Sequence, residues 1–352
     1  MNFVDKNFWR DKKVFVTGHT GFKGTWLTFI LNSFGAKVTG YALKPPTTNL
    51  FTLIDGENFS HSITGDVRDL KNLQAAFNDC QPEIVFHLAA QPIVIEGYKN
   101  PALTYSTNVM GTVNILECVR KSSTVKSFLN VTTDKVYRNN EWVWGYREDD
   151  LLDGNDPYSN SKSCSELVTN CYRQSFFDDN NVAISTARAG NVIGGGDFAE
   201  FRIIPDCVRA ALKGEKIFVR NPNSIRPYQH VLEPLFAYMM IAEAQYRDKK
   251  FAGNYNVGPD ESDNLTTRRL AEIFCKSWSE GLTWEINSDV QAKESNFLKL
   301  DCSKIKSVFG WAPRWDIETA IQKVVEWTKI YRDNGDILNC MRQQILSFMK
   351  NS

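Results

Sequence analysis

Two residues, Tyr158 and Lys162, carry the clearest chemical signal in the sequence. They stand four positions apart, and the preceding Asp156 and Pro157 are typical of a helix N-cap and first turn. Positions i and i+4 lie side by side on a helix, so the lysine ammonium would stabilise the phenolate and lower the tyrosine pKa from about 10. Such a phenolate could take a proton from a secondary alcohol near neutral pH. The spacing therefore predicts a general base at this helix start.

A second group of reactive side chains, Thr133, Asp134 and Lys135, follows an apolar run at 128–132 that predicts a strand. A hydroxyl, a carboxylate and an amine would then stand at the C-terminal end of a parallel strand, where open α/β sheets bind ligands. A strand that simply ends in a polar turn explains the same residues. Taken alone, the pattern leaves both interpretations open.

Three glycines, Gly18, Gly21 and Gly24, lie between an apolar run at 14–17 and a helical segment at 25–31. Strand, glycine loop and helix in this order are typical of a dinucleotide site, where the backbone approaches the pyrophosphate at a helix N-terminus. The spacing is G-x-x-G-x-x-G rather than G-x-G-x-x-G, and an ordinary glycine-rich turn is the alternative. We expect a nucleotide cofactor at this loop.

The end of the second predicted strand, at 37–42, bears on which cofactor binds. An acidic residue about 20 residues past the glycines would normally hold the ribose hydroxyls of NAD, and this strand end has none. Lys44 could bind the 2′-phosphate of NADP or be an ordinary solvated lysine. The loop therefore leaves NAD and NADP both open.

Asp66, just past a third predicted strand, is either a ligand-binding residue or a helix N-cap.

These side chains need a scaffold, which the surrounding pattern predicts. Apolar strands at 62–64 and 84–90 alternate with helical segments, as in a parallel sheet covered on both faces. We predict an α/β fold, with a doubly wound parallel sheet in a domain at 1–190, to which segments near 226–257 return. A smaller, mixed α/β lobe at 191–352 would bind substrate. Its expected helices and strands are 204–214, 217–219, 232–247, 255–257, 270–279 and 317–332.

The composition excludes several classes of protein. The chain has 352 residues, 42% hydrophobic and 23% charged, which is ordinary for a soluble globular enzyme. Lys plus Arg and Asp plus Glu are both 41, so we expect no nucleic acid or anionic membrane as partner. No apolar run approaches the ~18 residues of a membrane span, and a signal peptide is not expected. Eight cysteines without a C-x-x-C pair and four scattered histidines predict a reducing cytoplasm and no metal site.

Together the three motifs resemble the extended short-chain dehydrogenase/reductase family, and within it the CDP-glucose 4,6-dehydratases. The resemblance covers about residues 7–330, and its most specific stretches are RAGNVIGGGD, RNPNSIRPYQHVLEPL and FLKLDCSK. It implies a Rossmann domain that binds NAD, a nucleotide-sugar substrate held between this domain and a smaller C-terminal lobe, and a homodimer or homotetramer. The candidate interface is formed by the segments 102–119 and 158–176. Three departures from the family pattern, Ile95, Val136 and Asn296, bear on the sugar or base and leave the catalytic set intact.

The resemblance implies a reaction and a role for each catalytic residue. C4 of the sugar is oxidised by NAD, water leaves across C5 and C6, and hydride returns to C6. Thr133 would bind the 4-hydroxyl, Asp134 would protonate the departing 6-hydroxyl, and Tyr158 would be the base for the 4-hydroxyl. Lys162 would hold the nicotinamide ribose and tune Tyr158. Lys135 would remove the C5 proton if neutral or stabilise the enolate if charged.

The resemblance also implies two sets of binding residues. Those for the cofactor are Gly18, Thr20, Gly21, Phe22, Lys23, Gly24, Asp66, Val67, Leu88, Ala89, Ala90, Gln91, Asn108, Thr132, Tyr158 and Lys162. Those for the nucleotide sugar are Gln91, Thr133, Asn191, Arg202, Ile203, Arg220 and Arg226. The three arginines suit a diphosphate, because a guanidinium matches phosphate oxygens, although scattered surface arginines would look the same.

Three other functions remain as alternatives. They are a 4,6-dehydratase for a different nucleotide sugar, a nucleotide-sugar 4-epimerase, and a non-catalytic NAD-binding protein. The pair Asp134-Lys135 favours dehydration, because epimerisation at C4 needs no acid for the 6-hydroxyl. The presence of both Tyr158 and Lys162 argues against a protein without catalysis.

Overall fold

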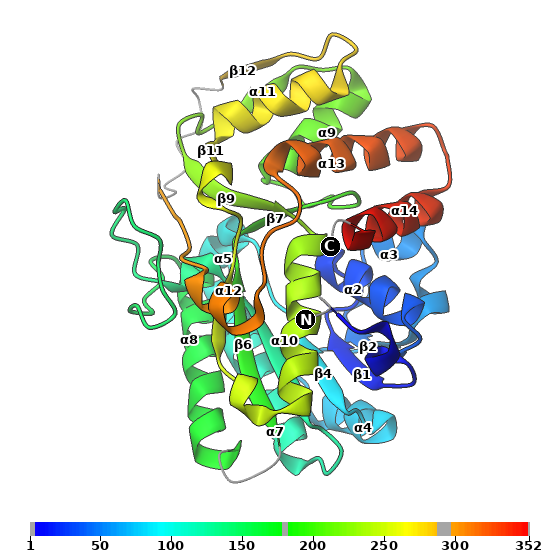
Figure 1. Ribbon diagram of the computed structural model, residues 1–352, viewed down its shortest axis with the longest axis vertical. Coiled ribbons are helices and arrows are strands. Elements are labelled where there is room, and N and C mark those ends of the chain that lie inside the picture. The colour runs from blue at the N-terminus through cyan, green and yellow to red at the C-terminus, as the bar shows by residue number, and fades with distance from the viewer. Residues whose placement is uncertain (1–3, 178–181, 287–296, 351–352) are drawn as a thin grey trace.

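A seven-stranded sheet forms the centre of the larger domain (Figure 1). The computed structural model describes residues 4–177, 182–286 and 297–350. The strand order is β10-β6-β5-β4-β1-β2-β3, and every pair is parallel. The strands are β1 (Lys13–Thr17), β2 (Lys37–Ala42), β3 (His61–Thr64), β4 (Ile84–His87), β5 (Ser127–Thr133), β6 (Ala183–Ala189) and β10 (Asn254–Val257). This confirms the predicted doubly wound parallel sheet of Rossmann type.

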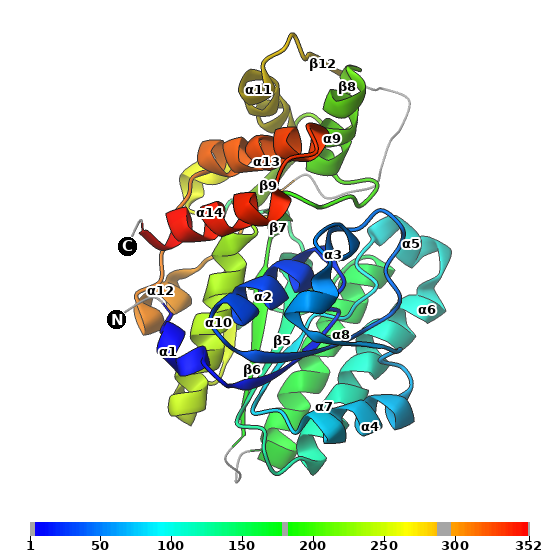
Figure 2. The same cartoon turned by 90° about the vertical axis from the view of Figure 1, so that its right-hand side faces the viewer.

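The strands are apolar on both sides because helices cover both faces of the sheet (Figure 2). Val14 and Val16 of β1 join the core beneath helices α2 (Phe22–Ser33) and α10 (Leu232–Arg247). Phe15, between them, joins the opposite core beneath α4 (Leu70–Cys80) and α7 (Gly111–Lys121). Residues 232–242 of α10 are all buried. No helix in the described part of the chain is long and apolar enough to cross a membrane.

Helix α8 (Pro157–Tyr172) begins as the sequence predicts and carries the Tyr158 and Lys162 pair. Asp156 is its N-cap, and the carboxylate accepts a hydrogen bond from the backbone N–H of Ser159 at 3.0 Å. Pro157 occupies the first helical position, where no backbone N–H donor is needed. The cap therefore fixes the helix start next to the carboxyl end of β5.

A smaller lobe with its own apolar core lies above the carboxyl ends of the strands (Figure 1). Its helices are α9 (Ile203–Lys213), α11 (Thr267–Trp278) and α13 (Ile317–Arg332). Its strands are β7 (Asn191–Ile193), β8 (Ile217–Val219), β9 (Ile225–His230), β11 (Asn264–Thr266) and β12 (Trp284–Ile286). β9 lies between β7, to which it is parallel, and β11, to which it is antiparallel, while β8 pairs with β12.

The chain crosses between the two parts more than once. From β9 it passes into α10 and then into β10, which completes the central sheet. Later, α12 (Ser303–Phe309) and α14 (Ile337–Lys350) also pack on the core of the larger domain. Helix α14 was not predicted from the sequence, and the predicted domain division near residue 190 stays a prediction. Asn296 lies outside the described residues.

Candidate active site

Two adjoining cavities open at the carboxyl ends of the central strands. The strand order reverses between β1 and β4, and ligands of open α/β sheets bind outside the strands at such a reversal. One cavity, of about 450 Å³, is lined by the glycine loop and by residues 65–68 and 88–92. The other, of about 270 Å³, lies between the sheet edge and the lobe. Four residues line both cavities: Phe22, Lys23, Pro92 and Arg202.

The glycine loop has a geometry that only glycine permits. Gly18 has a φ of +74°, and a Cβ atom there would lie 2.8 Å from the backbone nitrogen of Ala89. A Cβ atom on Gly24 would lie 2.1 Å from the carbonyl oxygen of Gly18. Helix α2 starts directly after Gly21, which contributes no capping side chain to the first-turn N–H groups. A pyrophosphate fits this position, since helix N-termini bind anions.

Most of the residues implied for the cofactor line the first cavity. They are Gly18, Thr20, Gly21, Phe22, Lys23, Gly24, Asp66, Val67, Leu88, Ala89, Ala90 and Gln91. Asn108 lies behind the cavity, where its side chain accepts from the N–H of Gln91 at 2.8 Å and donates to its carbonyl at 3.1 Å. Thr132 and Tyr158 line the second cavity instead.

The first cavity also has lining residues that the sequence analysis missed. These are Ala42, Leu43, Gly65, Arg68, Pro92, Leu103 and Thr107, while Arg202, which was expected to bind the nucleotide sugar, lines this cavity as well. Arg68 has the clearest effect, because its guanidinium pairs with both carboxylate oxygens of Asp66, at 2.5 to 3.0 Å, and holds the pKa of that carboxyl below its usual range. The signal for it was an arginine two positions after a candidate ligand. Lys44 does not line either cavity.

The segment that carries Asp134 and Lys135 is a short helical turn, η3 (Asp134–Val136), which begins where β5 ends. The hydroxyl of Thr133 donates to Asp134 Oδ1 at 3.0 Å and accepts from the Lys135 N–H at 3.3 Å. Burial raises the pKa of Asp134, and the nearby charge of Lys135 opposes this only in part. The other oxygen, Oδ2, is buried without a hydrogen-bond partner in the structure. A carboxyl in this state is suited to donating a proton.

Tyr158 and Lys162 occupy the first turns of α8, and both side chains are buried. Burial raises the pKa of Tyr158 to about 12, although a hydrogen bond with Thr133 and the charge of Arg202 act in the opposite direction. The expectation that the tyrosine pKa is lowered is therefore wrong for the protein alone, because desolvation outweighs the nearby positive charges. Burial also lowers the pKa of Lys162 to about 8, and its ammonium donates to the carbonyl of Val131 at 3.1 Å.

The second cavity brings together the remaining predicted site residues. It is lined by Thr133, Asp134, Lys135, Tyr158, Asn191, Arg202, Ile203, Arg220 and Arg226. Gln91 lines only the first cavity, and Lys162 lines neither. The lining residues come from β5, η3, α8, β7, α9 and β9, so the cavity has walls from both parts of the molecule.

Two of the arginines in this cavity are paired with carboxylates that the sequence analysis missed. Arg202 lies 3.1 Å from Asp197, and Arg220 lies 3.0 Å from Asp206. Both acids stand within a few positions of Arg202 in the sequence, which was the available signal. These pairs hold the guanidinium groups in the cavity wall, where a diphosphate would compete with the carboxylates for them.

A further cation, Lys23, lies between the two cavities. Burial lowers its pKa to about 7, and the charges of Lys162 and Arg202 add to this effect. The carboxylates of Asp134 and Asp197 oppose it. The wall shared by the two cavities therefore holds two basic side chains, Lys23 and Arg202, close together.

The comparison with known families settles which group of enzymes this architecture represents. The model of the GDP-mannose 4,6 dehydratase family matches residues 15–324. The chain belongs to this family. The resemblance to nucleotide-sugar dehydratases among the extended short-chain dehydrogenases/reductases is thereby confirmed.

Individual relatives agree with this family assignment. The CDP-glucose 4,6-dehydratase of Salmonella typhimurium is 45% identical, over 98% of this chain and 98% of the relative. In fold, the chain is similar to dTDP-glucose 4,6-dehydratase from Bacillus anthracis in complex with NAD (TM-score 0.76, 23% identity, 93% and 99% of the chains covered). It is also similar to UDP-glucose 4-epimerase from Thermotoga maritima with UDP-glucose (TM-score 0.78, 21% identity, 90% and 99% covered). The two solved structures establish the likeness of fold alone.

Proposed function

We propose that this protein converts CDP-glucose into CDP-4-dehydro-6-deoxyglucose and water, with NAD as its cofactor. The observation that carries the proposal is the placement of Asp134 and Lys135 in the same cavity as Tyr158. A tyrosine base alone serves an epimerase equally well, whereas loss of the 6-hydroxyl needs an acid and a group acting at C5. The 45% identity to a CDP-glucose 4,6-dehydratase supports the choice of nucleotide and sugar.

The residues of the first cavity fit NAD, which when bound would supply hydride-transfer chemistry for oxidation at C4 and reduction at C6. The glycine loop and the start of α2 would hold the pyrophosphate, Asp66 and Val67 the adenine, and Lys162 the nicotinamide ribose. NAD is favoured over NADP because Lys44, the candidate for a 2′-phosphate, does not line the cavity. The similar dTDP-glucose 4,6-dehydratase from Bacillus anthracis was also solved with NAD.

The residues of the second cavity supply the proton transfers. Thr133 holds the 4-oxygen, and Tyr158 takes the 4-hydroxyl proton as C4 becomes a ketone. The ketone acidifies the C5 proton. Neutral Lys135 removes this proton and returns it to C5 when hydride reaches C6; if Lys135 is charged, it stabilises the enolate instead, and the C5 proton is exchanged with water. Asp134 gives its proton to the 6-hydroxyl, which leaves as water. Arg202 and Arg220 hold the diphosphate.

The proposal is tested by incubating the protein with CDP-, dTDP-, UDP- and GDP-glucose and analysing the products by mass spectrometry. We expect loss of one water molecule, fastest with CDP-glucose. Substrate deuterated at C4 should give product deuterated at C6, without free reduced cofactor. Inversion at C4 without loss of water would instead identify an epimerase, and label appearing in solvent would contradict the mechanism.

We also propose a homo-oligomer, dimer or tetramer, that works in the cytoplasm, where its cysteines stay as thiols. Support for the oligomer comes from large apolar side chains exposed on neighbouring elements: Leu103 on α6 (Pro101–Tyr105), Met110 on the helical turn η2 (Ser106–Met110), and Leu167 on α8. These elements contact one another, and large exposed apolar patches commonly mark protein interfaces.

A further inference from the structure

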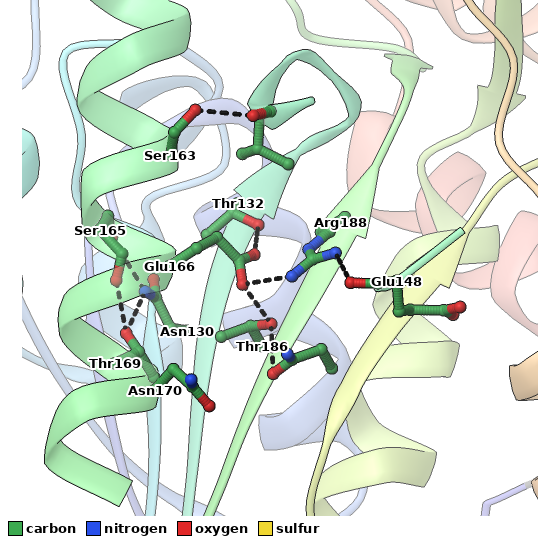
Figure 3. Close-up of polar contacts among 12 residues, drawn as sticks. Asn130, Thr132, Glu148, Ser163, Ser165, Glu166, Thr169, Asn170, Thr186 and Arg188 are labelled. Carbon is green, nitrogen blue, oxygen red and sulfur yellow. Dashed lines mark hydrogen bonds and ion pairs between the residues drawn. The ribbon is translucent and has the colours of Figure 1, made fainter. Parts of the chain in front are cut away.

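A buried ion pair links helix α8 to strand β6 (Figure 3). It has contacts at both ends of residues 133–136, which we call the catalytic segment. Glu166 on α8 and Arg188 on β6 approach to 3.0 Å, and each side chain is only 1% exposed. Burying two charges costs free energy that their attraction repays only in part, so such a pair is weak evidence of stabilisation. The contacts that it makes with the site offer a different explanation for it.

Glu166 fixes the strand end from which the catalytic segment begins. Its two carboxylate oxygens accept hydrogen bonds from the hydroxyl of Thr132 and, at 2.7 Å, from that of Thr186. Thr132 directly precedes Thr133 in β5. One turn earlier on α8, Lys162 donates to the carbonyl of Val131, so the helix holds this strand end at two points.

Arg188 fixes the point where the catalytic segment ends. Its guanidinium donates to the hydroxyl of Tyr137 at 2.7 Å and to the carbonyl of Glu148 at 2.8 Å, and it lies over the Tyr137 ring. Tyr137 is the first residue after η3, and its hydroxyl also donates to Asn256 of β10 at 2.7 Å. The position of Tyr137 is therefore set by β6 and β10, two strands of the central sheet.

These contacts form a closed ring around the reactive residues. It runs from Glu166 to Thr132, along residues 133–136 to Tyr137, and through Arg188 back to Glu166. We propose that Glu166 and Arg188 are a positioning pair, which holds both ends of this segment so that Asp134 and Lys135 meet the C5 and C6 atoms of the sugar. The inference rests on the proposed dehydratase function and assigns to it two residues that do not touch the substrate.

The ring should affect the loss of water more than the oxidation at C4. Asp134 and Lys135 lie within it, as does Thr133, which also has a hydrogen bond with Tyr158. Tyr158 itself lies outside the ring, at the start of α8 that is capped by Asp156. Loosening the ring should therefore slow loss of water more than oxidation at C4. A displacement of about 1 Å of a reacting group costs roughly 100-fold in rate.

The experiment uses the double substitution Arg188→Met/Glu166→Gln. It removes both charges together and the contacts to Tyr137 and Glu148. The glutamine keeps one acceptor oxygen for one of the two threonine hydroxyls, Thr132 or Thr186, and its amide N–H can donate to the other. In single turnover, we expect the near-ultraviolet absorbance of reduced nicotinamide to accumulate, with elimination slowed roughly 100-fold and KM little changed. Arg188→Lys keeps a charge opposite Glu166 but lacks the guanidinium fork, so a smaller change in the same direction is expected.

The matched control is Ser185→Ala, a buried substitution on the same strand but on its opposite face. Ser185 contacts Gln245 and accepts from the N–H of Gly253 at 2.9 Å, so the variant also loses buried hydrogen bonds. It should leave the ratio of the rate of C4 oxidation to the rate of water elimination unchanged. If both steps fall equally in the Arg188 variants, or fall only with the amount of folded protein, the pair is merely structural and the inference is overturned.

A measurement without substrate separates this inference from the proposed function. Amide hydrogen exchange of peptides covering 132–137 should speed up in the Arg188 variants and not in Ser185→Ala. Exchange in the part of α8 (Pro157–Tyr172) away from Glu166 should change little. If the wild-type protein dehydrates none of the nucleotide sugars, the proposed function fails, while exchange still tests the ring. Unchanged exchange at 132–137 overturns the positioning pair.

Discussion

At the scale of single residues, the pKa values of Asp134 and Tyr158 are shifted in the same direction. Burial raises the pKa of both groups, to about 12 for Tyr158, so burial favours the protonated form of each. For Asp134 this is the form that an acid needs. For Tyr158, the proposed base, it is the opposite of the form that a base needs. Proton removal from the 4-hydroxyl would then depend on nearby positive charge, such as that of Lys162, Arg202 and a bound oxidised nicotinamide.

Lys135 is predicted to act after C4 oxidation, and Lys135→Met tests this directly. Without the amine, the reaction should stop at the 4-keto sugar, and the absorbance of reduced nicotinamide should build up on the enzyme. Stopped-flow absorbance during a single turnover measures this. Dehydration at the wild-type rate would mean that Lys135 is a structural lysine.

Tyr158→Phe should fail at the earlier step. The phenol is the proposed base, whereas the glycine loop and Lys162 are the proposed contacts to the cofactor. We therefore expect nucleotide binding to persist, with turnover lowered ~10²-fold or more and no absorbance of reduced nicotinamide. Equilibrium titration with NAD and steady-state assays check the two halves. Near-normal turnover would remove Tyr158 from the mechanism.

At the scale of elements, the helices and strands with clear boundaries were predicted well. β2, α10 and α13 match the predicted 37–42, 232–247 and 317–332. Four strands were not predicted. β7, β11 and β12 have three residues each, too few to show an alternating apolar pattern, and β9 contains Pro227, a residue that argues against a strand. Helix α14 was missed because its apolar side chains pack with those of α2 and α10, which are distant in sequence and cannot be recognised as its partners from the sequence.

The candidate site was predictable where residues act through the backbone or through nearby positions. The glycine loop and the Tyr158 and Lys162 pair are of this kind. The partnership of Glu166 with Arg188 was not predictable, because it depends on how α8 and β6 are placed on either side of β5. The raised pKa of Tyr158 was missed for a similar reason, since burial of a side chain is a property of the assembled fold.

Helix α10 and the chain leading into α13 are joined by a buried carboxylate that should respond to pH. Glu233 accepts from the N–H groups of Arg314 and Trp315 at 2.9 and 2.8 Å, and burial raises its pKa to about 7. The folded protein then binds this proton more tightly than the unfolded chain does. The contribution of Glu233 to stability is therefore greatest at low pH and is lost as the pH rises through 7.

Glu233→Gln keeps an acceptor for both N–H groups and removes the charge. We expect a larger gain in Tm relative to wild type at about pH 8.5 than at about pH 5.5. Glu261→Gln is the control, because Lys299 holds the pKa of that exposed carboxyl low and its loss brings no gain at high pH. Equal changes in Tm at both pH values would contradict the linkage.

At the scale of the whole molecule, α14 fastens the lobe to the larger domain (Figure 2). Its Gln344 donates to the carbonyl of Lys323 on α13 at 2.9 Å. On the other side, Phe348 packs against Phe236 of α10, and Arg342 lies over the ring of Phe29 of α2. The C-terminal helix therefore limits how far the lobe can move away from the sheet edge that carries the site.

The proposed oligomer makes a prediction about two exposed apolar side chains. Met110 and Leu167 are 50% and 54% exposed. Met110→Glu and Leu167→Glu should shift the protein towards monomer, because a buried interface would have to desolvate the new charge. Light scattering coupled to size exclusion measures the mass. Leu346→Glu, on α14, is the control and should leave the mass unchanged, and a wild-type monomer would refute the proposal.

The four residues shared by the two cavities imply that the cofactor and the sugar nucleotide do not bind independently of each other. Lys23 and Arg202 line both cavities, so an anionic diphosphate bound in one cavity would change the electrostatic potential in the other. Thermodynamic linkage then requires reciprocity: the factor by which CDP-glucose alters the Kd of NAD must equal the factor by which NAD alters the Kd of CDP-glucose. Calorimetric titration of Tyr158→Phe, in both orders, would reveal this mutual coupling, and Arg202→Met should bring the factor towards one.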